Sequence, residues 1–265
     1  MNGKRNHAVA TICLILSLHV FFCSAVLAEE KPLKVFILAG QSNMLGKGKV
    51  HELPAELKGP QKLVQMTLNG KGWAALSPSK KEDGSVGLEF SFAKEMSSRL
   101  NQPIGIIKQA IGGTSLAKDW NPEAPKSLYA NLLVKVLAAQ QARRVEIVGM
   151  CWLQGERDSR QQEMADSYAE NLSRFIRRAR KDFHSLNMFF VAGRVNPPYP
   201  FIKAVRLAQE KCPLPGYAFV DCDKLSKIPP GDLHYDTKGL VELGRKFADA
   251  MLSLMKQKEP EKATK

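Results

Sequence analysis

The hydrophobic positions of the chain fall into two kinds of segment that alternate along its length. The first kind is short and dense in Val, Ile, Leu and Phe, with no regular alternation of apolar and polar residues. Such runs are typical of parallel strands that are covered on both faces. They predict five strands: Lys34–Ala39, Ile104–Ala110, Glu146–Leu153, Met188–Val195 and Tyr217–Asp221.

The second kind has apolar residues three and four positions apart, which is the period of a helix with one buried face. These segments predict five helices: Glu89–Leu100, Ser127–Gln141, Gln161–Phe183, Phe201–Lys211 and Thr237 to about Met255. Strands that alternate with helices predict an α/β fold. We expect a three-layer α/β/α sandwich around a five-stranded parallel sheet.

The segment Leu45–Val86 departs from this alternation, because it contains Gly, Pro and Lys but little periodicity. It follows the first predicted strand. Ligands of open parallel sheets bind outside the carboxyl ends of the strands. We therefore expect an irregular loop that helps to wall a binding site.

The N-terminus has the features of a secretory signal peptide. Lys4 and Arg5 precede the mostly apolar stretch Thr11–Ala25, and Val26-Leu27-Ala28 resembles a cleavage site. The alternative is a membrane anchor, but the stretch is short for a spanning helix. We predict a signal peptide over residues 1–28, a mature domain over 29–257, a disordered tail over 258–265, and a secreted or periplasmic protein without a stable membrane anchor.

Cleavage after residue 28 leaves Cys151, Cys212 and Cys222. This odd number leaves at least one free thiol within the chain. Cys212 and Cys222 flank a loop that contains Pro and Gly, and they could pair in an oxidising compartment, whereas Cys151 lies in an apolar run. No Cys or His spacing matches a structural metal site, so we expect neither a metal nor a cofactor.

The formal charge of the 265 residues is +13, and loss of Lys4 and Arg5 with the signal peptide lowers it to +11. The basic residues are scattered apart from one concentration between Arg174 and Lys181, whose spacing is typical of the solvated face of a helix. No basic motif is interleaved with aromatic residues. We therefore expect no nucleic-acid partner.

The first candidate for chemistry is Ser42, in the run Gly40–Asn43 directly after the first predicted strand. A serine on a tight turn at a strand end exposes its hydroxyl to both a base and a substrate carbonyl, as a nucleophile requires. The alternative is an ordinary turn or helix-cap serine.

Three further segments lie at or beyond strand ends. The paired glycines of Gly112–Ser115 would let backbone N–H groups approach a ligand, as an oxyanion hole requires, or would form a plain turn. Gln154 could donate amide hydrogens to an oxyanion, or could be a buried amide that satisfies loop backbone. His234 could act as a general base, or could be a surface histidine.

The order of these segments, with Ser first and Asp and His last, resembles the SGNH or GDSL-type esterase superfamily. It is most similar to the sialate O-acetylesterase and acetylxylan esterase group, carbohydrate esterase family six. The matching segments are GQSNM, GGTS, WLQGE and DLHYDTKG, and the resemblance spans Val35 to about Ala250. It implies the flavodoxin-like SGNH hydrolase fold and a secreted serine esterase that removes O-acetyl groups from sialic acid, xylan or another acetylated polysaccharide.

The resemblance also implies roles for individual residues. Ser42 matches the nucleophile and His234 the base. The backbone N–H groups of Ser42 and Gly113 and the side chain of Gln154 match the oxyanion donors.

The acid that orients His234 stays open between two residues. The common superfamily spacing, Asp-x-x-His, would place Gly231 in the acid position, whereas some members of the closer group have Asp-x-His. That spacing favours Asp232. Glu156 is the alternative.

An acetyl ester on a sugar is the substrate that the resemblance implies. The predicted substrate contacts are Gln41, Asn43, Trp120, Arg157 and Arg194, with Asp158, Asn196 and Tyr199 as further polar or aromatic candidates. Arg157 and Arg194 could favour an acidic sugar. The alternatives are a lipid or thioester hydrolase of the GDSL type and a non-catalytic carbohydrate-binding pseudoenzyme.

Overall fold

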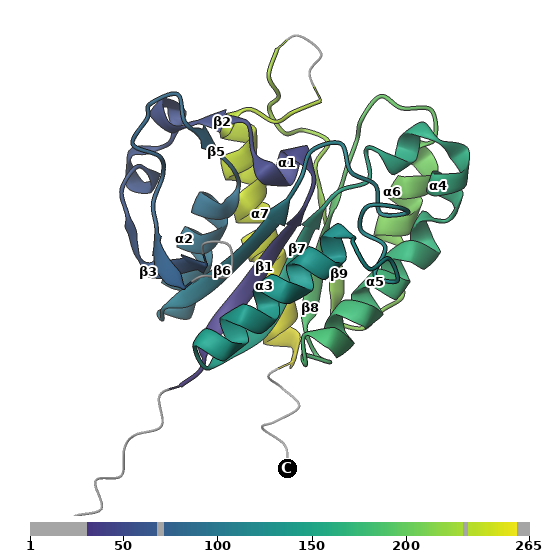
Figure 1. The fold of residues 1–265 in the computed structure, drawn as a ribbon. Coiled ribbons are helices and arrows are strands. Elements are labelled where there is room, and N and C mark those ends of the chain that lie inside the picture. Colours follow the sequence, from purple (N-terminus) through teal and green to yellow (C-terminus); the bar gives the residue numbers. More distant parts are fainter. Residues whose placement is uncertain (1–30, 68–71, 230–232, 259–265) are drawn as a thin grey trace, which may run out of the picture. The chain divides into compact units, whose positions relative to one another are not determined.

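A computed structural model describes residues 31–67, 72–229 and 233–258. Within them, the main sheet has seven strands in the order β4-β3-β6-β1-β7-β8-β9 (Figure 1). The strands are β1 (Leu33–Gly40), β3 (Gln61–Thr67), β4 (Trp73–Leu76), β6 (Ile104–Ala110), β7 (Val145–Leu153), β8 (Phe189–Arg194) and β9 (Tyr217–Asp221). The five predicted strands are confirmed as β1, β6, β7, β8 and β9, all parallel to their neighbours in this set. Their spatial order is the flavodoxin-like 2-1-3-4-5.

The prediction of an irregular loop over Leu45–Val86 is wrong in part, because this segment adds two strands to the sheet. β3 pairs parallel to β6, and β4 pairs antiparallel to β3, so the sheet is mixed rather than purely parallel. The segment also forms the short antiparallel pair β2 (Gly48–Lys49) and β5 (Ser85–Val86). Only Gln61, Val64 and Thr67 of β3 are buried, so the strand has neither a dense apolar run nor a period of two.

Helices cover both faces of the sheet, which confirms the three-layer sandwich. α2 and α7 pack together on one face, and α3, α5 and α6 cover the other (Figure 1). The helices are α1 (Ser42–Leu45), α2 (Glu89–Leu100), α3 (Leu128–Ala142), α4 (Gln162–Asp166), α5 (Tyr168–Asp182), α6 (Ile202–Glu210) and α7 (Thr237–Lys258), with 3-10 turns at Val50–Glu52, Ala55–Leu57 and Asp158–Arg160. The single helix predicted over Gln161–Phe183 is interrupted at Ser167, whose hydroxyl donates to the carbonyl of Glu163.

The three cysteines of the described residues, Cys151, Cys212 and Cys222, are free thiols, so Cys212 and Cys222 do not pair. No helix in the described ranges combines the length and the apolar character needed to cross a bilayer. The predicted signal peptide lies outside the described residues, as does the predicted tail beyond residue 258.

Candidate active site

Three central strands end at the same level, and the candidate site lies just beyond them. Gly40 at the end of β1 is paired with Ala110 of β6 on one side and with Leu153 of β7 on the other. Beyond the strands, the N–H of Gln41 donates to the carbonyl of Leu153 at 3.0 Å. The segments after β1, β6 and β7 therefore leave the sheet side by side, at the point where strand order reverses.

The turn after β1 requires a glycine. Gly40 has φ +152°, and a Cβ at this position would overlap the carbonyl oxygen of Leu153. The chain then enters α1, whose first residue is Ser42. Because the first N–H groups of a helix have no partner within it, the Ser42 N–H is directed away from α1.

The far end of α1 is anchored by an ion pair. The ammonium of Lys108, on β6, donates to the carbonyl of Leu45 at 2.9 Å and pairs with the Glu89 carboxylate at 2.6 Å. Both side chains are about nine-tenths buried. The short helix that carries Ser42 is thus fixed to the sheet at both ends.

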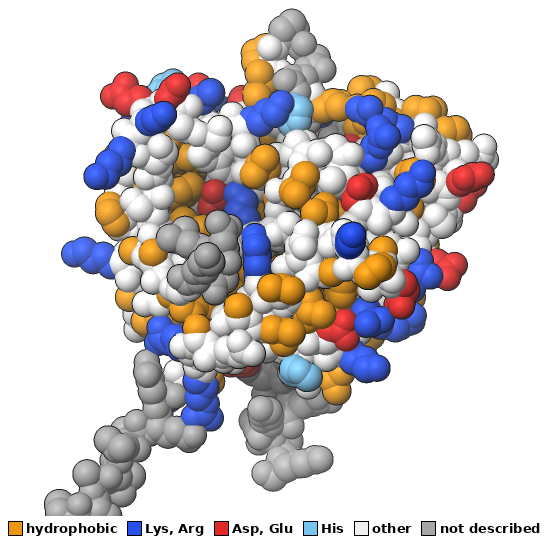
Figure 2. Space-filling model, in the orientation of Figure 1, with side chains coloured by type: hydrophobic (Ala, Val, Ile, Leu, Met, Phe, Trp, Pro, Cys, Tyr) orange, Lys and Arg blue, Asp and Glu red, His pale blue; other side chains and the backbone are white. Residues whose placement is uncertain are grey.

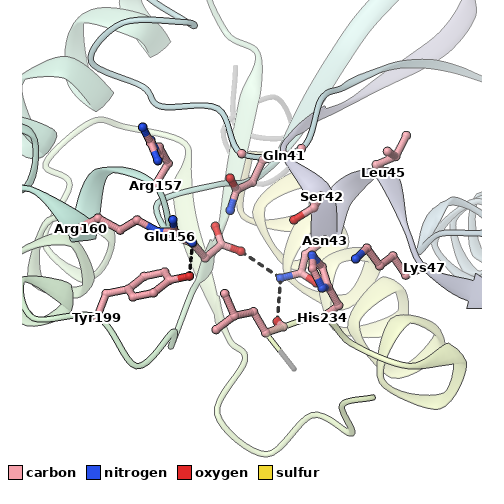
Figure 3. Close-up of a pocket in the computed structure, with 13 residues that line it drawn as sticks. Gln41, Ser42, Asn43, Leu45, Lys47, Glu156, Arg157, Arg160, Tyr199 and His234 are labelled. Atoms are coloured by element: carbon pink, nitrogen blue, oxygen red, sulfur yellow. Dashed lines mark hydrogen bonds between the residues drawn. The ribbon is translucent and has the colours of Figure 1, made fainter. Parts of the chain in front are cut away.

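A pocket of about 380 Å³ opens at this edge of the sheet (Figure 3). The residues that line it come from the segments after β1, β6, β7 and β8 and from the loop before α7: Gln41, Ser42, Asn43, Leu45, Lys47, Gly112, Gly113, Glu156, Arg157, Arg160, Tyr199, Leu233 and His234. The structure therefore brings Ser42, the paired glycines and His234 together in one cavity.

The glycine pair faces the serine. A Cβ on Gly112 would lie 3.4 Å from the Cβ of Ser42. Gly113 has φ +74°, and a Cβ there would have no neighbour within 4 Å. The backbone of the turn is thus open to the pocket beside the Ser42 hydroxyl, which is the position that oxyanion donors require.

Asn43 follows Ser42 and connects three segments. Its Nδ2 donates to Oε1 of Glu156 at 2.9 Å and to the carbonyl of Leu233 at 3.3 Å (Figure 3). Its Oδ1 accepts from the N–H of Tyr235 at 3.1 Å. The side chain is only 4% exposed, so its amide is engaged within the protein and the prediction that it contacts substrate is not supported by this geometry.

Glu156 is a buried carboxylate at the wall of the pocket. Burial raises the pKa of this carboxyl, while the bond from Asn43 and, more weakly, the charge of His234 favour its ionised form. The Gln41 side chain points toward it (Figure 3) and also favours the ionised form. Its Oε2 nevertheless has no hydrogen-bond partner among the described residues.

Asp158 is also buried, but it lies away from the pocket. Its Oδ2 accepts from the N–H of Leu116 at 2.9 Å and from Nε2 of Gln154 at 2.6 Å, and its Oδ1 accepts from the N–H of Ala117 at 3.0 Å. Burial raises its pKa, and these donors act in the opposite direction. Asp158 therefore holds the loop that follows the glycine pair and does not contact a substrate in the pocket.

Two predicted site residues belong to the same internal network. Both amide hydrogens of Gln154 are used, because Nε2 donates to Asp158 and, at 2.9 Å, to the carbonyl of Thr114. Gln154 is fully buried, and its amide satisfies loop backbone and Asp158 in this structure, so its role as an oxyanion donor stays a prediction. Trp120 is also fully buried and donates to the Thr114 hydroxyl, so its contact with a sugar likewise stays a prediction.

The two arginines predicted to contact substrate lie in different places. Arg157 lines the pocket, whereas Arg194 lies outside it and pairs with Glu210, Asp221 and Asp223. The sequence did not connect these acids to Arg194, and a substrate contact of this residue stays a prediction.

Asn196 also lies outside the pocket and donates to the carbonyl of Asp223. Tyr199 lines the pocket. Asp232, the favoured acid, lies outside the described residues, so its role stays a prediction.

Sequence reasoning missed two cations at the pocket, Lys47 and Arg160. Lys47 lies five residues after Ser42, a proximity that could have identified it. The Arg160 guanidinium lies 4.3 Å from the centre of the Tyr199 ring and donates to the Tyr199 hydroxyl. In Figure 2, Lys and Arg side chains lie on either side of a histidine near the upper edge of the molecule.

The chain is similar to known proteins in sequence and in fold. The family model described as "Carbohydrate esterase, sialic acid-specific acetylesterase" matches residues 32–253. The relative named "Probable carbohydrate esterase At4g34215", from Arabidopsis thaliana, is 28% identical over 244 residues, which cover 84% of this chain and 91% of the relative. The crystal structure of the At4g34215 protein superposes with a TM-score of 0.74 and covers 84% of this chain and 98% of that chain.

Two more distant structures share the fold. NanS has a TM-score of 0.66 at 17% identity, over 86% of this chain and 98% of its own. A carbohydrate acetylesterase from Xanthomonas citri has a TM-score of 0.64 at 19% identity, over 83% of this chain and 56% of its own. The family match over most of the chain is decisive: the protein is a carboxylic ester hydrolase and belongs to the sialic acid-specific acetylesterase family of carbohydrate esterases.

Proposed function

We propose that this protein removes O-acetyl groups from an acidic carbohydrate through an acyl-enzyme mechanism in which Ser42 is the nucleophile and His234 the base. The observation that carries the proposal is that Ser42, the paired glycines and His234 line one pocket whose exposed charges are cationic. The carbohydrate esterase family supplies the acetyl ester as the bond to be cleaved.

Acylation begins when the Ser42 hydroxyl attacks the acetyl carbonyl and passes its proton to His234. The negative charge that develops on the carbonyl oxygen is stabilised by the backbone N–H groups of Ser42 and Gly113. Collapse of the tetrahedral intermediate breaks the ester bond, and the departing sugar oxygen takes the proton from His234. The acetyl group is then held on Ser42.

Deacylation repeats these steps with water. His234 removes a proton from a water molecule, which attacks the acetyl carbonyl, and the same N–H groups stabilise the second oxyanion. Cleavage of the acyl bond releases acetic acid and returns the proton to Ser42. No net proton or electron is left on the protein.

The charge around the pocket supports an acidic sugar. Lys47, Arg157 and Arg160 are exposed there, whereas Glu156 is the one carboxylate among the described lining residues and is buried. A cavity lined by one sign of charge raises the local concentration of substrates of the opposite sign. A carboxylated sugar that carries the acetyl group, such as a sialic acid or a uronate, fits this arrangement.

The proposal is tested with the purified protein and its Ser42→Ala and His234→Ala variants on 4-nitrophenyl acetate. We expect each substitution to lower kcat by at least about 10³-fold, as is found when a nucleophile or a base is deleted. Equal rates for wild type and Ser42→Ala would exclude Ser42 as the nucleophile. In a series from acetate to octanoate, a preference for octanoate would favour a lipid esterase instead.

The substrate is tested separately by acetate release from O-acetylated sialic acid and from acetylated xylan, a neutral comparison. Arg157→Gln should raise KM about threefold for the acidic substrate and leave KM for the neutral one unchanged, because exposed ion pairs contribute less than about 1 kcal/mol. An equal effect on both substrates would contradict charge recognition by Arg157.

The orienting acid is tested by comparing Asp232→Asn with Glu156→Gln. We expect Asp232→Asn to cause the larger loss of kcat, because Asp-x-His spacing places Asp232 two residues before the base. The reverse order would assign the role to Glu156.

We also propose that the protein is exported and that its signal peptide is cleaved. N-terminal sequencing of protein exported by a bacterial host should begin at Glu29, directly after the predicted cleavage site. A chain that starts at residue 1 and stays with the membrane would contradict cleavage.

A further inference from the structure

The side chain of Asn43 holds the chain on both sides of His234. It donates to the carbonyl of Leu233 and accepts from the N–H of Tyr235, the two residues that flank the histidine. Its second donated bond goes to Glu156, on the segment after β7. One amide therefore connects the turn of the nucleophile, the loop of the base and the buried carboxylate.

The Asn43 amide is committed to other parts of the protein. Each amide hydrogen of Asn43 has an acceptor and its oxygen has a donor, and the side chain is nearly fully buried. An amide that bound substrate would expose at least one of these groups to the pocket. The contacts of Asn43 are thus those of a residue that fixes other residues.

The Asn43 bonds reach the loop that carries His234 from outside that loop. Ser42 is held by the sheet through Gly40 and α1, whereas His234 lies on irregular chain before α7. The bond that the Ile228 N–H donates to the carbonyl of His234, at 3.0 Å, ties the histidine to its own loop and not to the nucleophile. The two bonds from Asn43 cross from the residue next to the nucleophile to the residues next to the base.

We infer that Asn43 is a positioning residue that sets the distance and angle between His234 and Ser42. The inference rests on the proposed function of these two residues. A displacement of about 1 Å in a reacting group can cost on the order of 10²-fold in rate. Loss of the Asn43 bonds should therefore lower the rate of the chemical step and leave the affinity for substrate nearly unchanged.

The experiment is a double-mutant cycle with Asn43→Ala and His234→Ala in the full chain, assayed on 4-nitrophenyl acetate. Asn43→Ala alone should lower kcat about 10- to 100-fold and change KM less than about threefold. In the His234→Ala background the same substitution should lower the residual kcat less than about twofold, because residues that act as a unit are not additive. Equal losses in both backgrounds would overturn the inference.

A matched control separates positioning from stability. Asn171, on α5, is also a buried amide and donates to the Ser167 hydroxyl at 3.1 Å. Asn171→Ala should lower the urea midpoint of unfolding by an amount similar to Asn43→Ala and keep wild-type kcat. A loss of kcat in Asn171→Ala as large as that in Asn43→Ala would show a general effect of stability and overturn the inference.

A second variant keeps the test valid if Asn43→Ala does not fold. Asn43→Leu has nearly the same size and adds no charge, but its side chain can neither donate to Glu156 or Leu233 nor accept from Tyr235. It should lower kcat with little change in KM, and wild-type kcat would overturn the inference. If Ser42→Ala itself keeps wild-type activity, the proposed function fails; if Ser42→Ala is inactive and both Asn43 variants are fully active, only the positioning role fails.

Discussion

Glu156 and Asp158 are two buried carboxylates only two residues apart, yet their surroundings are opposite. Asp158 accepts three hydrogen bonds and lies outside the pocket, whereas Glu156 accepts one from Asn43, lines the pocket and has an oxygen without a partner among the described residues. Burial raises the pKa of both. Burial is therefore common to the two acids, and what differs is how many donors hold each carboxylate and whether it faces the pocket.

The largest expected effect is on stability, from removal of the satisfied acid. Asp158→Ala leaves the N–H groups of Leu116 and Ala117 and one amide hydrogen of Gln154 without an acceptor. Each of these three orphaned buried donors costs about 1–3 kcal/mol, so the free energy of unfolding should fall by about 3 kcal/mol or more. Urea unfolding measures this change.

The control for that experiment is Asp166→Ala, because Asp166 is exposed. It should change the free energy of unfolding by no more than about 0.5 kcal/mol. If Asp158→Ala costs as little as this control, the structural role of Asp158 is wrong.

The next effect is on activity, from the acid at the pocket. Glu156→Gln keeps the shape of the side chain and an oxygen that accepts from Asn43, but removes the ionisable carboxyl near His234. We expect kcat to fall about tenfold, which corresponds to about 1.4 kcal/mol, with little change in stability. Unaltered kcat combined with a large loss of stability would make Glu156 the same kind of residue as Asp158.

The smallest expected effect is on how the stability of the folded protein changes with pH. Because burial raises the pKa of Glu156 in the folded protein, the stability linked to this group is present below its ordinary pKa of 4.5 and is lost as pH rises through the folded value. Gln does not titrate. Glu156→Gln should therefore gain stability relative to wild type as pH rises above the ordinary pKa of 4.5, measured by thermal unfolding of the two proteins at matched ionic strength. A difference that stays constant or shrinks with pH would contradict a raised pKa.

The fold was largely predictable because its central strands are buried on both faces. The runs around Ile37, Ile107 and Met150 contain almost no polar residues, and such density is visible without a structure. β3 was not predictable in this way, because two of its seven residues, Lys62 and Leu63, are exposed and its buried positions are three apart. The segment is a strand because its backbone pairs with that of β6.

The candidate site was predictable in position but not in the direction of each side chain. Sequence order places Ser42, Gly113 and Gln154 beyond the ends of three strands, and all three segments meet there. Gln154, however, points into the core toward Asp158, while Arg157, three residues later, lies at the pocket. Which way a polar residue points after a strand depends on contacts with distant segments, such as the Thr114 carbonyl that Gln154 binds.

The level ends of β1, β6 and β7 also limit how this enzyme can change during evolution. Side chains alternate between the two faces of a strand, so one inserted residue within β1 would turn its apolar side chains to the wrong faces and displace Ser42 from the glycine pair. Lys47, Arg160 and Tyr199 lie on segments outside the strands of the main sheet, where insertions are tolerated. Mutation can therefore exchange the walls of the pocket while Ser42, the proposed nucleophile, remains fixed to the end of β1.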